Sequence, residues 1–156
     1  MNLSPHITLA EFTASSTAAR RGIDNTLPDR LMANALATAA MLETIRAYLS
    51  KLAGKDAPII VTSGYRCLPL NRAVGSSDTS DHTKAMAADW RAPAFGTPYE
   101  IAKALAPLVE KLGIGQLIHE FPGPNAWVHT STRTPTKPVN RVITIRPTGT
   151  ELGIKA

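Results

Sequence analysis

The sequence has one cysteine, few aromatic side chains and no long hydrophobic run, and each shortage excludes a class of protein. Cys67 stands alone among 156 residues, so no disulfide can form within the chain and a disulfide-stapled scaffold is excluded. No apolar stretch approaches the ~20 residues that a membrane-spanning helix needs. The N-terminus shows no basic region followed by an apolar run, so we expect synthesis in the cytoplasm without a secretory signal.

The overall composition is that of an ordinary globular protein with a positive charge. Hydrophobic residues make up 44% and charged residues 19% of the chain. No repeat or linker divides it, so we predict a single domain over residues 1–156 with a core of its own. The formal charge of +5 favours anionic partners. The basic residues are scattered and do not alternate with aromatic ones, so we predict no nucleic-acid binding.

The hydrophobic pattern predicts helices first and then strands with one helix inserted. Apolar residues recur every three or four positions over 28–52, which is typical of a helix packed on a core. A capping pattern, Thr97-Pro98-Tyr99-Glu100, begins a second helix that ends before Gly113. The segments that we predict as strands are 59–62, 86–90, 116–121, 127–131 and, at an edge, 140–146. This order favours an α+β domain, an antiparallel sheet with helices mainly on one side.

Two histidines and an aspartate are the strongest candidates for a metal site. Asp89 is a lone acid in a segment that looks buried, and a buried carboxylate needs a cation or strong donors. A metal ion held with His82 and His129 meets that need, and so does a salt bridge to Arg66 or Arg91. Two imidazoles and one carboxylate are a ligand set that leaves the fourth position of a catalytic zinc ion open for water.

Glu120 and Arg66 are the candidates for the remaining chemistry. Glu120 ends a predicted strand that a Pro-Gly-Pro turn joins to the strand of His129, so the two side chains can lie close together. A carboxylate there can take a proton from water, although an exposed structural glutamate fits equally. Arg66 can hold a substrate carboxylate or an oxyanion, or pair with a structural acid. His119 precedes Glu120 and should face the other side of the strand.

Taken together, these motifs resemble a known family. The Ser-Gly-Tyr-Arg at 63–66, the Ser-x-His-x-x-Ala-x-Ala-x-Asp at 80–89 and the Trp-x-His at 127–129 resemble the D-alanyl-D-alanine carboxypeptidase-like zinc metallopeptidases. Residues 3–12 and 21–25 are similar to a subgroup. The resemblance covers roughly 3–131, the expected core of the zinc peptidase domain, and leaves 132–156 as a strand and tail without a motif.

The resemblance implies a role for each candidate. One Zn²⁺ ion would be held at the sheet by His82, Asp89 and His129, and Glu120 would be the general base. Many members carry their base three residues before the last ligand, where this chain has Ala126. We therefore place the chain with the subgroup whose glutamate lies on the preceding strand.

Substrate binding is assigned in the same way. The resemblance implies that Arg66 binds the substrate and assists catalysis, with Tyr65 and Ser80 beside it. Ala85 departs from the family, which usually has glycine at this position. If the backbone there needs a positive φ, the alanine methyl group strains it.

By this resemblance the protein hydrolyses the stem peptides of bacterial peptidoglycan. The expectation is a monomeric phage or prophage endolysin that cuts the L-alanyl-D-glutamate bond and reaches the periplasmic cell wall after holin-type release. A cell-wall D-alanyl-D-alanine carboxypeptidase is the alternative. A rival of another class is a catalytically silent cell-wall-binding or virion protein that zinc merely stabilises.

Overall fold

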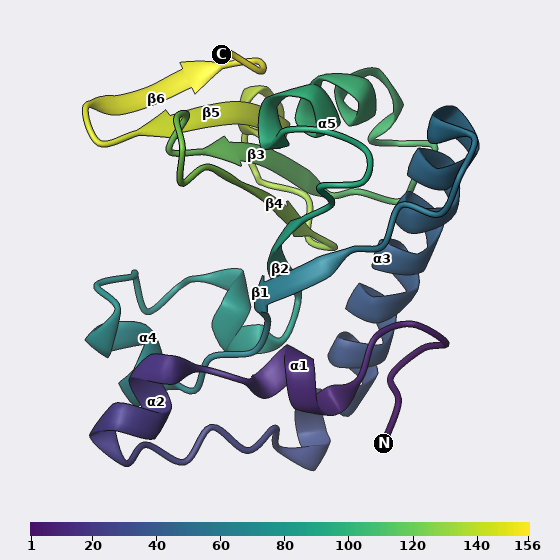
Figure 1. Cartoon of the computed structure of the whole chain (residues 1–156). Coiled ribbons are helices and arrows are strands. Elements are labelled where there is room, and N and C mark those ends of the chain that lie inside the picture. The colour runs from purple at the N-terminus through teal and green to yellow at the C-terminus, as the bar shows by residue number, and fades with distance from the viewer.

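The computed structural model describes residues 1–156, a single α+β domain built on one six-stranded sheet (Figure 1). Across the sheet the strand order is β1-β2-β4-β3-β5-β6. The strands are β1 (Ile60–Ser63), β2 (Ala87–Arg91), β3 (Gln116–Glu120), β4 (Trp127–Ser131), β5 (Val142–Arg146) and β6 (Gly149–Leu152). The predicted α+β class is therefore confirmed.

Five α-helices and four short 3₁₀ turns complete the chain. The helices are α1 (Leu9–Thr13), α2 (Ser16–Arg21), α3 (Met32–Ala53), α4 (Leu68–Ala73) and α5 (Pro98–Leu105). The 3₁₀ turns are η1 (Asp29–Leu31), η2 (Asp81–Lys84), η3 (Ala106–Leu108) and η4 (Pro138–Arg141). No helix of the structure combines the length and the apolarity needed to cross a membrane.

The sheet is mixed, where the sequence led us to expect an antiparallel one. β1, β2, β4 and β3 are antiparallel neighbours, but β5 runs parallel to β3. The reason is the connection after Ser131. The chain crosses through 132–141 and returns beside β3 in the same direction. The strand predicted at an edge is also internal, because β6 pairs with its outer side and forms the true edge.

The core lies on one face of the sheet. Helix α3 supplies Ala35, Ala39, Leu42, Ile45 and Leu49, which are fully buried in one cluster with residues of α5, β2, β3 and β4. Alternate residues of β2, β3 and β4 point to this face. The short helices α1, α2 and α4 gather near the β1 end of the sheet (Figure 1). The other face of the sheet carries the polar residues that matter for function.

Glu43, on α3, fastens the N-terminal segment to the body of the protein. Its carboxylate accepts hydrogen bonds from the Ser4 hydroxyl (2.6 Å) and from the backbone N–H of His6 (2.7 Å), and it meets the His6 ring at 2.9 Å. Partial burial raises the pKa of Glu43, but the hydrogen bonds from Ser4 and His6 outweigh it and hold the pKa below its usual value. The folded state therefore favours the ionised carboxylate.

We predict that Glu43→Ala lowers the free energy of unfolding by about 1 kcal/mol at neutral pH, because it removes charge-assisted hydrogen bonds from a partly exposed site. Since the folded pKa is depressed, this contribution is lost as the pH falls below about 4. Denaturant unfolding at pH 7 and pH 3 measures both effects, with Glu110→Ala as the exposed control. An equal loss at both pH values would contradict the assignment.

Candidate metal centre

The sheet itself brings two of the predicted metal ligands together. Asp89 of β2 and His129 of β4 are direct register partners on adjacent antiparallel strands, so their side chains project from the same face. The third residue, His82, comes from η2, a turn capped by the Ser80 hydroxyl shortly before β2 begins. The predicted convergence of the three residues is confirmed, and all three are buried.

The three donor atoms surround one point. His129 Nδ1 lies 2.8 Å and His82 Nε2 lies 3.3 Å from the same oxygen, Asp89 Oδ1. The candidate ligand atoms all lie within 4.8 Å of one another. His82 Nδ1 is 2.6 Å from the carbonyl oxygen of Gly64. Because that carbonyl can only accept, Nδ1 carries the proton and the lone pair of Nε2 faces the centre.

These residues fit a zinc ion. Bonds of about 2.0–2.1 Å in a tetrahedral zinc site separate the ligand atoms by roughly 3.3 Å, close to the spacing found here. Burial raises the pKa of the Asp89 carboxyl, but the imidazoles of His82 and His129 outweigh it and hold the pKa far below its usual range. The site therefore offers an ionised carboxylate and two imidazole nitrogens, a donor set that suits zinc.

Arg66 is the arginine that adjoins this cluster. Its Nη1 lies 4.0 Å from Asp89 Oδ2, the oxygen that does not face the histidines. Its Nε donates to Asn71 Oδ1 at 3.1 Å, which fixes the plane of the guanidinium. Arg91, the other candidate partner of Asp89, donates instead to the carbonyl oxygen of Ala126. Nη1 also donates to the Ser63 hydroxyl at 3.4 Å, and the remaining N–H groups of Arg66 can bind a further anion.

Glu120 lies on the metal face of the sheet, next to the cluster. β3 pairs with β4, and Glu120 Oε1 lies 3.7 Å from His129 Nδ1. Burial and the nearby Asp89 carboxylate raise the pKa of Glu120 to about 7. A carboxylate with such a pKa can both take up and release a proton near neutral pH. His119, as predicted, faces the opposite side, where its ring packs near Tyr99 and contacts the Lys155 carbonyl.

One cavity of about 380 Å³ opens onto these groups. Its lining includes six residues named so far, Arg66, Ser80, His82, Asp89, Glu120 and His129, together with Trp127 and Phe121. Tyr65 does not line it, because this side chain is 5% exposed and belongs to the hydrophobic core. The structure thus brings together every predicted site residue except Tyr65.

Residues 5–131 match the family described as peptidase M15. The chain belongs to the peptidase M15 family. Membership makes it a zinc metallopeptidase, in agreement with the donor set of His82, Asp89 and His129. At the family level it also indicates a peptidase that acts on peptidoglycan. No curated protein matches the sequence.

The close approach of Phe12 explains why this M15 peptidase carries glycine at position 64 of its Ser-Gly-Tyr-Arg motif. A Cβ at Gly64 would lie 2.3 Å from the Phe12 carbonyl oxygen and 2.5 Å from the Phe12 ring. The backbone of α1 therefore approaches the motif more closely than any side chain allows. That approach places the Gly64 carbonyl where it orients His82.

Asn25 is a buried residue of the site that sequence reasoning missed. Its side-chain amide donates to the carbonyl oxygens of Thr13 and Tyr65, both at 2.9 Å, and its Oδ1 accepts from the N–H of Cys67 at 2.8 Å. These bonds hold the backbone on both sides of Arg66. The similarity of residues 21–25 to the family contained this asparagine, but two of its three partners, Tyr65 and Cys67, lie 40 and 42 positions away.

Ala85 stands where the family usually has glycine, and its backbone has the positive φ that a glycine at this position suggests. Its φ is +56°, and the residue is fully buried. This left-handed backbone costs an alanine roughly 1 kcal/mol relative to glycine. The Thr38 hydroxyl on α3 donates to the Ala85 carbonyl at 2.8 Å, which helps to hold the turn between His82 and Asp89. The departure from the family pattern therefore leaves the metal face intact.

We predict that zinc raises the melting temperature of this M15 peptidase, because a ligand that binds only the folded state stabilises that state. The free energy of unfolding should rise by about 2.7 kcal/mol when free zinc is at a hundred times its Kd. His129→Ala should abolish the zinc-dependent increment. His6→Ala is the control, since this histidine lies outside the cluster. A full increment in His129→Ala would contradict the site. Differential scanning fluorimetry with and without zinc measures it.

Proposed function

We propose that this M15 peptidase is a phage or prophage endolysin that hydrolyses the L-alanyl-D-glutamate bond of peptidoglycan stem peptides. One observation carries the proposal: a zinc-fitting cluster opens into a cavity that also holds a free guanidinium and a carboxylate of raised pKa. Metal-assisted peptide hydrolysis can use these three kinds of group together: a Lewis acid, an anchor for negative charge and a proton acceptor. The formal charge of +5 supports an anionic polymer as the partner.

In this proposal His82, Asp89 and His129 hold the zinc ion. When bound, zinc polarises the scissile carbonyl and makes water nucleophilic near neutral pH. Glu120 accepts the proton that the attacking water loses. As the water oxygen bonds to the carbonyl carbon and the C–N bond breaks, Glu120 returns that proton to the leaving amine. The position of Glu120 beside His129 supports this role.

Arg66 anchors an anionic group of the substrate. Its guanidinium is fixed by Asn71 and contacts Asp89 only at 4.0 Å, so N–H donors remain for a carboxylate or for the developing oxyanion. Ser80 lines the same cavity and contributes its hydroxyl group. Tyr65 acts from outside the cavity, because its carbonyl, held by Asn25, fixes the loop that carries Arg66.

Two rival functions would use the same residues differently. A D-alanyl-D-alanine carboxypeptidase would place a terminal carboxylate on Arg66. A catalytically silent wall-binding protein would need neither Glu120 nor Arg66, yet both line the cavity. Digestion of intact peptidoglycan followed by mass spectrometry separates the three. We expect new N-terminal glutamate; release of free D-alanine supports the carboxypeptidase, and binding without cleavage by the zinc-loaded protein overturns hydrolysis.

We predict that Glu120→Gln lowers kcat on peptidoglycan fragments by about 10²–10⁴-fold, because the amide cannot accept the proton of the attacking water. Zinc content should stay at that of the unchanged protein. The matched control is Glu110→Gln, at an exposed residue that does not line the cavity. Metal analysis beside steady-state kinetics checks both points, and undiminished kcat in Glu120→Gln would remove Glu120 from the mechanism.

A further inference from the structure

A second cavity, of about 410 Å³, adjoins the metal pocket. The two cavities share three lining residues, Ser76, Ser80 and His129. Since His129 belongs to both, the second cavity begins at the metal cluster itself. The two cavities therefore adjoin at the reacting centre, which places the second within reach of a substrate held at the cluster.

The floor of the second cavity is an apolar strip of the sheet. Ile118 of β3 pairs with His129 on one side and with Ile143 of β5 on the other. Ile145 of β5 pairs with Glu120 in the next row. Residues paired across neighbouring strands share a face, so these isoleucines continue the face that carries the metal cluster. Ile118, Ile143 and Ile145 all line the cavity.

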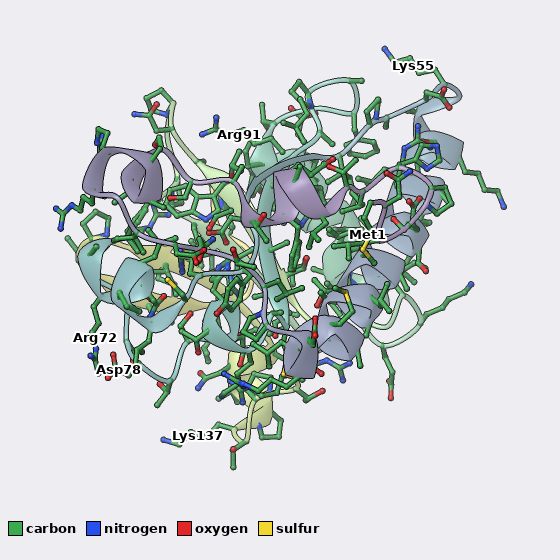
Figure 2. All side chains as sticks on the ribbon, turned by 90° about the horizontal axis from the view of Figure 1, so that it is seen from below. Met1, Lys55, Arg72, Asp78, Arg91 and Lys137 are labelled. Atoms are coloured by element: carbon green, nitrogen blue, oxygen red, sulfur yellow. The ribbon has the colours of Figure 1, made fainter.

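The wall opposite β5 is made of hydroxyl groups from the loop after α4. Ser76, Ser77, Thr79 and Ser80 line it. Two side chains of α4 hold this loop: Asn71 donates to the Ser77 carbonyl at 2.7 Å, and Arg72 pairs with Asp78 at 2.8 Å at the edge of the molecule (Figure 2). The loop is thereby tied to α4, which precedes it.

Arg133 supplies a positive charge at the same cavity. Its Nε donates to the buried carboxylate of Asp81, which also accepts from the Ser131 hydroxyl at 2.8 Å. The Arg133 side chain is 41% exposed, so its terminal N–H groups are accessible to a ligand. The cavity therefore joins an apolar floor, a hydroxyl wall and an arginine whose Nε is paired with Asp81. The other N–H groups of Arg133 suit a peptide with a small aliphatic side chain and a nearby carboxylate.

Three of the lining residues lie outside the part of the chain that matches the family. The match ends at residue 131, and Arg133, Ile143 and Ile145 follow it. Segment 132–156 adds β5 and β6 to the sheet beside β3. Without β5 the cavity would lose two of the three isoleucines of its floor, so the C-terminal segment builds a feature that the matched region alone lacks.

We propose that the second cavity is a substrate subsite that binds the peptide chain on one side of the scissile bond. The inference rests on the proposed function and deepens it. The metal pocket takes the residues at the bond and the second cavity takes residues beyond it, so together they favour cleavage within a peptide chain. Only a long substrate reaches the second cavity and gains its binding energy. The C-terminal segment therefore sets the preference for an endopeptidase reaction.

The test fills the cavity from two sides. Ile145→Trp places a large ring on the floor, and Thr79→Trp places one on the exposed opposite wall. The control is Val139→Trp, a 59% exposed residue of η4 that lines neither cavity. Retention of the zinc-dependent melting shift shows that each variant is folded and loaded.

We expect both cavity variants to lower kcat/KM on a complete stem peptide at least tenfold, chiefly through KM. We also compare kcat/KM for the complete stem peptide with kcat/KM for peptides truncated on either side of the bond. This ratio should fall in the cavity variants, because they lose the contacts that only the complete peptide makes. Val139→Trp should match the parent protein. Unchanged KM in both cavity variants would overturn the subsite.

A binding measurement separates this proposal from the proposed function. Calorimetry of the complete stem peptide with Glu120→Gln protein needs no turnover, and adding Ile145→Trp or Thr79→Trp should weaken the Kd at least tenfold. If the parent protein cleaves no peptidoglycan but the Kd responds, the hydrolytic function fails and the subsite stands. If cleavage occurs and the Kd does not respond, the subsite alone fails.

Discussion

A buried carboxylate at the centre of the sheet is the constraint on which the rest of the structure depends. Asp89 is 8% exposed and ionised, and it lies between two imidazoles with a guanidinium behind it. A buried anion is stable only where its surroundings supply donors or a cation. The Gly64 carbonyl orients His82, the β2–β4 register places His129, and Asn71 orients Arg66. Each of these contacts keeps a partner directed at the same carboxylate.

The fold separates stability from chemistry on the two faces of one sheet. Helices α3 and α5 bury the alternate strand residues on one face, and the metal cluster lies on the other. The pairing of β3 with both β4 and β5 carries the functional face outward from the cluster. The parallel strand β5 therefore extends the face that carries the metal cluster, and the second cavity lies on this extension.

The parts that could be predicted from the sequence are those that local patterns encode. The helix over 28–52 follows from its apolar period, and the grouping of His82, Asp89 and His129 follows from motifs with fixed residue types. The parallel pairing of β5 was not predicted, because it depends on how 132–141 crosses the sheet. β6 was missed because all its residues are exposed and show no alternation. Asn25 was missed as a site residue, and Tyr65 was predicted beside the substrate but lies in the core, because both positions depend on the tertiary fold.

The central claim is that one zinc ion, held by this cluster, makes the M15 peptidase hydrolytic. The most direct measurement is to strip the metal with a chelator, return zinc in substoichiometric steps, and record peptidoglycan hydrolysis at each step. The account predicts activity that rises linearly with bound zinc and levels off at one ion per chain, and no rise in Asp89→Ala. Hydrolysis that persists in fully stripped protein, or that returns in Asp89→Ala, would contradict it.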